Sequence, residues 1–133
     1  MRTRYTSSEA SVMTGELRGC LLDTNVVIGV LKEFAPAVEL LRSVGDDTPL
    51  GYSAITRMEL LGYPGLTAEE AAAIESTLAT MTYMGLTGAI EDRAIALRQN
   101  HRIKLPDAII AATALESSYR LLTLDEGLAA VFA

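Results

Sequence analysis

The chain has 133 residues, half of them hydrophobic, and its 11 Lys and Arg against 17 Asp and Glu give a formal net charge of -6. These values predict one domain with a hydrophobic core, and the negative charge argues against a protein whose whole surface binds nucleic acid. The sequence has no apolar stretch of the roughly 20 residues that a membrane span needs and no apolar signal core at its start. We therefore expect a soluble, cytoplasmic protein with no membrane partner.

Residues 1–18 are rich in Ser, Thr, Arg and Glu without an apolar period, so we expect a flexible N-terminal extension, with Met13 as an alternative start. From residue 19 on, short apolar runs alternate with segments of helical periodicity. Strands are predicted at residues 19–22, 50–52, 82–86 and 120–123. Helices are predicted at residues 24–33, 36–44, 53–61, 67–79, 87–102 and 106–117.

This alternation predicts an α/β fold over residues 19–133, with a central parallel sheet of four to five strands and helices on both faces. Open sheets of this class bind ligands beyond the carboxyl ends of their strands. Polar residues that directly follow a strand are therefore the first candidates for a functional site.

Four carboxylates fall where this topology would place them on one rim of the sheet. Asp23 and Asp125 directly follow strands, Asp107 begins a helix, and Glu59 lies about two helical turns beyond the second strand. Singly, the aspartates can be explained as helix caps or as partners of a helix dipole. Glu59 is harder to explain in this way, because it stands among apolar residues with no Lys or Arg four positions away.

Taken together, the four acids would repel one another unless they were protonated or bound to cations, which indicates a site for Mg²⁺ or Mn²⁺. A ligand set of carboxylates without His or Cys suits phosphate-ester chemistry. The single histidine, His101, lies among basic residues at a predicted helix end and is more simply a solvated residue there. A serine hydrolase is disfavoured because no Gly-x-Ser-x-Gly segment accompanies this histidine.

Four segments of the chain carry a resemblance to a known family. They are residues 21–28 (LLDTNVVI), 55–61 (ITRMELL), 105–115 (LPDAIIAATAL) and 121–125 (LLTLD). In this order they resemble the successive motifs of PIN-domain ribonucleases, and in particular of VapC-type toxins of toxin-antitoxin pairs. The resemblance covers roughly residues 20–132, and LPDAIIAA is its most specific part.

The resemblance implies an acidic catalytic site that binds Mg²⁺ (or Mn²⁺) through Asp23, Glu59, Asp107 and Asp125. It implies that Thr24 and Asn25 orient the first acid or a phosphate and that Thr123 supports the fourth acid. It further implies a homodimer and a cognate antitoxin protein whose peptide covers the acidic cleft. The Val and Leu residues of the helices at 24–33 and 36–44 would line a groove for an amphipathic antitoxin segment.

The function we predict is that of a metal-dependent endoribonuclease, a toxin that hydrolyses phosphodiester bonds of RNA. Asp23 and Asp107 would hold one or two Mg²⁺ ions, and either Asp125 or Glu59 could assist as the base. The RNA backbone would contact basic residues that are otherwise simply solvated surface, namely Arg93, Arg98, Arg102 and Lys104.

Two alternatives stay open. A phospho-acceptor, receiver-like signalling domain shares a small α/β fold with Mg²⁺ among aspartates, but here Leu22 rather than a second acid precedes Asp23, and no lysine follows Lys104. A catalytically inert PIN-fold binding partner is the other alternative. The four acids argue against this alternative, because their mutual repulsion would bring no benefit to a site without activity.

Overall fold

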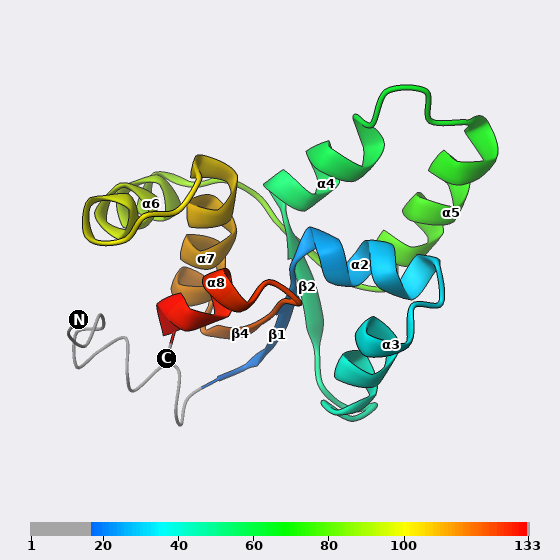
Figure 1. The fold of residues 1–133 in the computed structure, drawn as a ribbon, viewed down its shortest axis with the longest axis horizontal. Coiled ribbons are helices and arrows are strands. Elements are labelled where there is room, and N and C mark those ends of the chain that lie inside the picture. Colours follow the sequence, from blue (N-terminus) through cyan, green and yellow to red (C-terminus); the bar gives the residue numbers. More distant parts are fainter. Residues whose placement is uncertain (1–16, 133) are drawn as a thin grey trace.

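The computed structural model describes residues 17–132, with four strands and a larger number of short helices in that range (Figure 1). The strands are β1 (Gly19–Leu22), β2 (Leu50–Ser53), β3 (Thr82–Met84) and β4 (Tyr119–Leu122). The helices are α2 (Thr24–Leu31), α3 (Ala35–Arg42), α4 (Ala54–Leu61), α5 (Ala68–Leu78), α6 (Gly88–Asn100), α7 (Leu105–Ser117), α8 (Glu126–Ala129) and the 3₁₀ turn η1 (Ala130–Phe132). The expected extension lies outside the described residues except for its last two positions. None of the described helices is long and apolar enough to cross a membrane.

The sheet has the strand order β3-β2-β1-β4, and every neighbouring pair is parallel. The predicted α/β class and parallel sheet are therefore confirmed, with four strands in the described part of the chain. Strand β3 is shorter than predicted, because its last residue pairs with Ser53, where β2 ends and α4 begins. Strand β4 begins one residue earlier than predicted, because Tyr119 already pairs with Gly19.

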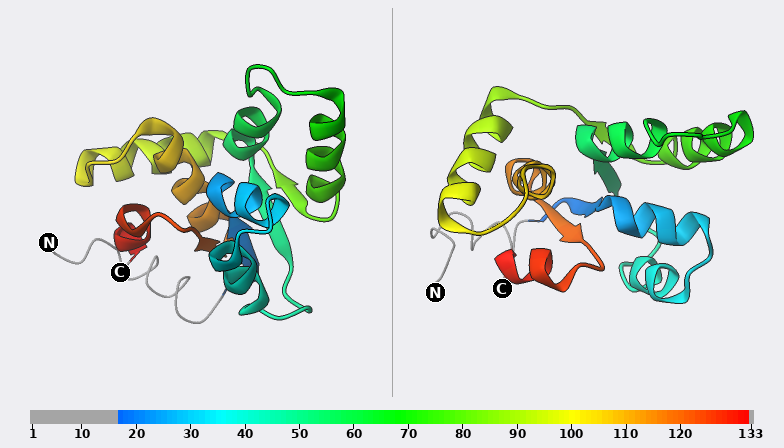
Figure 2. Two further views of the ribbon diagram at one scale, coloured as in Figure 1. Left: turned by 45° about the vertical axis from the view of Figure 1, so that its right-hand side comes forward. Right: turned by 45° about the horizontal axis from the view of Figure 1, so that its top comes forward.

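Helices cover both faces of the sheet (Figure 2). The side chains of β1 alternate between the two faces. Cys20 and Leu22 join a core that includes Val26 and Val27 of α2. Leu21, on the opposite face, packs with residues of α7 such as Ile110. The ribbons in Figure 1 show α2 beside α3 on one side of the molecule and α6 beside α7 on the other.

Three strands pass into a helix through a polar residue that caps that helix. Asp23 after β1, Ser53 at the end of β2 and Asp125 beyond β4 each accept a hydrogen bond from a backbone N–H in the first turn of the next helix. Because the strands are parallel, all three caps lie at the carboxyl edge of the sheet. The local chemistry that ends each strand thus also gathers polar side chains at that edge.

Candidate active site

Asp23 is the buried centre of the carboxyl edge, with only 5% of its surface exposed. Its Oδ1 accepts the Thr24 backbone N–H at 2.8 Å, and its Oδ2 accepts the Thr123 hydroxyl at 2.7 Å. Burial raises the pKa of Asp23, the two hydrogen bonds oppose that rise, and the negative charges of Asp107 and Glu59 add to it. The structure therefore holds this carboxylate in place but disfavours its ionised form.

Asn25 and Thr123 tie the corner after β1 to the corner after β4. Asn25 Oδ1 accepts the Leu124 backbone N–H at 3.2 Å, and its Nδ2 donates to Thr123 Oγ1 at 3.5 Å. Thr123 Oγ1 also accepts the Asp125 backbone N–H at 3.0 Å. We expected Thr123 to support Asp125. Its hydroxyl instead donates to the carboxylate of Asp23, and its contact with Asp125 is to the backbone N–H of that residue.

Glu59 is exposed on α4, and its partner is a hydroxyl group rather than a cation. Thr24 donates its hydroxyl proton to Glu59 Oε1 at 2.7 Å, and Thr24 Oγ1 lies 2.9 Å from Thr56 Oγ1. An ionised carboxylate only accepts, and a hydroxyl has one proton. Because Thr24 gives its proton to Glu59, Thr56 must be the donor to Thr24.

The chain of hydroxyl groups continues into the core. Ser53 Oγ lies 3.5 Å from Thr56 Oγ1 and accepts the Thr56 backbone N–H at 3.2 Å. Ser53 and Thr56 are both fully buried, so their hydroxyls bond to protein groups rather than to bulk water. Three hydroxyls in series, from Ser53 through Thr56 to Thr24, therefore aim a proton at Glu59.

Sequence reasoning missed Thr56 as a support for the site. The signal available was its position three residues before Glu59, which puts the two on one side of α4. Its contact with Thr24 could not be read from that spacing, because the two residues are 32 positions apart and meet only where α2 and α4 lie side by side.

Asp107 and Asp125 complete the set of acids. Asp107 is half-buried in the first turn of α7, and its pKa is raised by burial and by the charges of Asp125 and Glu59, while Lys104 lowers it. Asp125 is exposed, and its Oδ1 accepts the backbone N–H groups of Gly127 at 2.8 Å and Leu128 at 3.2 Å. Asp125 is therefore the N-cap of α8, as one explanation from the sequence had it, but its Oδ2 takes no part in these cap hydrogen bonds.

The four acids influence one another electrostatically, since Asp107 and Glu59 act on Asp23, and Asp125 and Glu59 act on Asp107. Within residues 17–132, however, no three His, Cys, Asp or Glu side chains converge closely enough to enclose a metal ion. Mg²⁺ usually keeps several waters and takes one or two carboxylates from the protein. The oxygen-only donors, with two raised pKa values that a nearby cation would lower, suit a hydrated divalent ion better than an ion enclosed by protein ligands.

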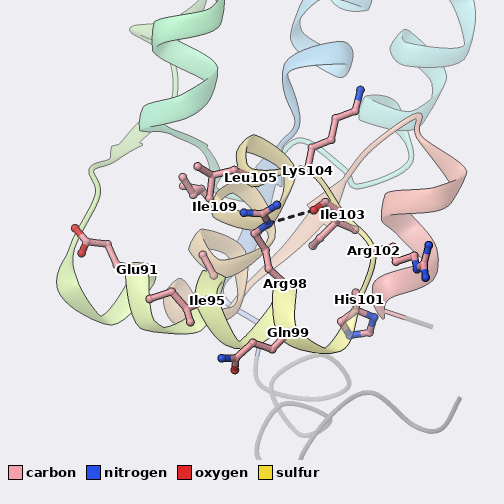
Figure 3. A pocket seen from close by; sticks show the side chains of 11 residues that line it. Glu91, Ile95, Arg98, Gln99, His101, Arg102, Ile103, Lys104, Leu105 and Ile109 are labelled. Carbon is pink, nitrogen blue, oxygen red and sulfur yellow. Dashed lines mark hydrogen bonds between the residues drawn. The ribbon is translucent and has the colours of Figure 1, made fainter.

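The predicted RNA-contacting residues divide into two groups. Arg98, Arg102 and Lys104 line a hollow of about 910 Å³ between α6, α7 and their connecting segment (Figure 3). Arg93 lies elsewhere on α6, where its guanidinium pairs with Glu116 of α7 at 2.6 Å. The hollow adjoins the acids through Lys104, which precedes Asp107 by three residues and lowers its pKa.

The sheet is parallel and covered on both faces, Asp23 and Asp125 follow strands at its carboxyl edge, and Asp107 and Glu59 lie near enough to act on Asp23 electrostatically. The PIN domain family matches residues 20–132, and the chain belongs to this family. The receiver-like alternative is thereby excluded.

The chain resembles Ribonuclease VapC10 of Mycobacterium tuberculosis, to which it is 33% identical over 110 residues, or 79% of this chain and 81% of that protein. It is also similar to a toxin-antitoxin complex from Klebsiella pneumoniae, with 30% identity, a TM-score of 0.70, and coverage of 80% of this chain and 87% of that one. A structure of VapBC2 from Rickettsia felis bound to a promoter DNA fragment has a TM-score of 0.72 at 15% identity, covering 84% and 92% of the two chains, and shows the shared fold. The resemblance to VapC-type proteins is confirmed.

Proposed function

We propose that the protein is an Mg²⁺-dependent endoribonuclease and the toxin of a toxin-antitoxin pair. The observation that carries the proposal is the gathering of four acids from four separate segments at the carboxyl edge of a PIN domain. The similarity to a protein named Ribonuclease VapC10 supports RNA as the substrate.

Each residue of the site has a distinct role in this proposal. Asp23, fixed by Thr24 and Thr123, and Asp107, at the start of α7, would hold the ion directly. A bound divalent ion supplies positive charge for the phosphate oxygens and lowers the pKa of the waters around it. Glu59 and Asp125 would bind water beside the acids and orient one molecule toward the phosphorus atom. As the water oxygen bonds to phosphorus, one of these two carboxylates would take its proton, and the P–O bond to the departing ribose oxygen would break.

The partner in this proposal is a cognate antitoxin, as the similarity to a toxin-antitoxin complex suggests. A second hollow, of about 350 Å³, lies beside α2 and α3 and contains Val30, Val38 and Leu41. Its apolar lining suits the buried face of an amphipathic segment. We expect an arginine of this segment to reach Asp23 and Asp107 and inhibit the enzyme by pairing with them.

Cleavage of RNA by the purified protein tests the proposal. We expect cleavage with Mg²⁺ or Mn²⁺, loss of cleavage with EDTA, and poor activity with Ca²⁺, whose looser coordination suits this chemistry less. Asp107→Asn should be inactive and serves as the control for a contaminating nuclease. Cleavage that persists in excess EDTA would contradict the proposed mechanism, and a wild type that cuts no RNA under any of these conditions would favour the inert binding partner.

A further inference from the structure

The hollow between α6 and α7, which we call the α6–α7 groove, combines positive charge with exposed apolar surface. Its lining includes three cations, Arg98, Arg102 and Lys104, and one acid, Glu91. Its apolar lining includes Ile95, which is 57% exposed, and Leu105, which is 51% exposed. In a chain of net charge -6, this concentration of cations favours an anionic ligand that also has an apolar part.

One hydrogen bond to the backbone orients Arg98 within this groove. Its Nε donates to the Ile103 carbonyl at 3.3 Å, so the planar guanidinium is tied at one edge while the rest of the exposed side chain is open to a ligand. Figure 3 shows this guanidinium in the middle of the lining residues, near Ile109, whereas Arg102 points outward. A tethered guanidinium plane is a surface on which an unpaired nucleobase can stack.

We propose that the α6–α7 groove binds an unpaired nucleotide of the RNA, with its base stacked on Arg98 above Leu105 and Ile109. This inference rests on the proposed function and names Arg98 as the residue that holds one base of the RNA beside the acids. A base within a duplex is stacked between its neighbours and cannot enter the groove.

The position of Lys104 connects the groove with the acids. Lys104 is the N-cap of α7, and Asp107 lies in the first turn of the same helix, so about one helical turn separates them. A phosphate beside Lys104 would leave the neighbouring phosphate within reach of Asp107. The groove thus serves to place an unpaired segment so that the bond next to it is cut.

Substitution of Arg98 by Lys tests the stacking contact, because Lys keeps the charge and lacks the planar group. Arg120→Lys is the matched control, since Arg120 is exposed on β4 outside the groove. Binding is measured by fluorescence anisotropy in EDTA, which prevents cleavage, with an unstructured RNA of about 12 nucleotides and a duplex of the same sequence. Size-exclusion chromatography with light scattering reports the oligomeric state of each variant.

We expect Arg98→Lys to weaken binding of the single strand by about tenfold, which is the scale of one lost stacked base, with duplex binding unchanged. Arg120→Lys should match wild type on both RNAs. The inference is overturned if Arg98→Lys binds the single strand like wild type or weakens both RNAs equally. It is also overturned if the substitution alters only the oligomeric state, since the groove would then belong to an interface between copies of the chain. A wild type that neither binds nor cuts RNA refutes the proposed function itself, a result distinct from these.

Discussion

Replacing Asp107 by Asn removes one negative charge from the site while keeping the shape of the side chain. Two opposing effects follow in the metal-free protein. The variant loses the favourable interaction of Asp107 with the N-terminus of α7, which is about 0.3 to 1 kcal/mol. It also loses the burial cost of the charge and its repulsion by Asp125, Glu59 and Asp23.

The repulsion should prevail. Repulsion between like charges is stronger at a partly buried site than in bulk water, and Asp107 interacts with three acids, namely Asp23, Glu59 and Asp125. We therefore expect Asp107→Asn to raise the free energy of unfolding of the metal-free protein by about 1 kcal/mol, or about 4 °C in Tm at this chain length. If Asp107 only complemented the helix dipole, the variant would instead melt at a lower temperature.

The response to Mg²⁺ should change in the opposite direction. Wild type gains about 2.7 kcal/mol when Mg²⁺ is at 100 times its dissociation constant, and the variant should gain much less because a ligand is missing. Thermal melts of both proteins, each with EDTA and with Mg²⁺, measure the two effects. Asp92→Asn, an exposed change on α6, is the control and should show neither. A less stable apo variant with an undiminished Mg²⁺ response would refute the reasoning.

The same melts, repeated at a series of pH values, test whether the charge of Asp107 destabilises the metal-free protein. The pKa of Asp107 is raised above its ordinary value of 3.8 in the folded protein, so its charged form is disfavoured there. The resulting penalty is absent below pH 3.8, where the side chain is protonated in both states, and grows as the pH rises through the raised pKa. The gap in Tm between the metal-free variant and wild type should therefore close on acidification, and a gap that persists at low pH would contradict the electrostatic cause.

Three further outcomes are expected. Thr56→Val should lower the free energy of unfolding by about 1 to 3 kcal/mol and weaken Mg²⁺ binding measured by calorimetry, with both restored in Thr56→Ser; unchanged Mg²⁺ affinity would make the hydroxyl chain purely structural. Arg93→Gln breaks a partly exposed ion pair, so it should lower the free energy of unfolding by less than about 1 kcal/mol and leave the affinity for RNA unchanged. A marked loss of affinity would mean that Arg93 contacts RNA. Cys20 is buried and its pKa is raised by that burial, so thiol reagents should label it only after unfolding; rapid labelling of the native protein would contradict the packing of β1.

The sequence was sufficient for the order of the strands and of the helices up to α7, because three of the four strands are followed by a helix whose capping residue can be recognised locally. Asp23 and Ser53 each begin a helix through a bond to a backbone N–H one to three residues on, and such signals can be read from the chain. The length of β3 could not be read in this way, because it depends on where its partner β2 stops.

The supports of the acids were less predictable than the acids themselves. Their contacts join residues far apart in the chain, as in the bond from Thr123 to Asp23, which spans 100 positions. The exposure of Glu59 depends on which side of α4 faces α2, and its apolar sequence neighbours suggested the wrong environment. Arg93 looked like its basic neighbours until the packing of α6 on α7 brought it to Glu116.

The most direct test of the metal site is diffraction from crystals soaked in Mn²⁺, with data collected at the manganese absorption edge. Mn²⁺ takes oxygen ligands as Mg²⁺ does and marks its own position by anomalous scattering. We predict an anomalous peak between the carboxylates of Asp23 and Asp107, and its loss in Asp107→Asn. Manganese bound only at other acids, such as the exposed Asp46 and Asp47, with none beside Asp23, would contradict the account.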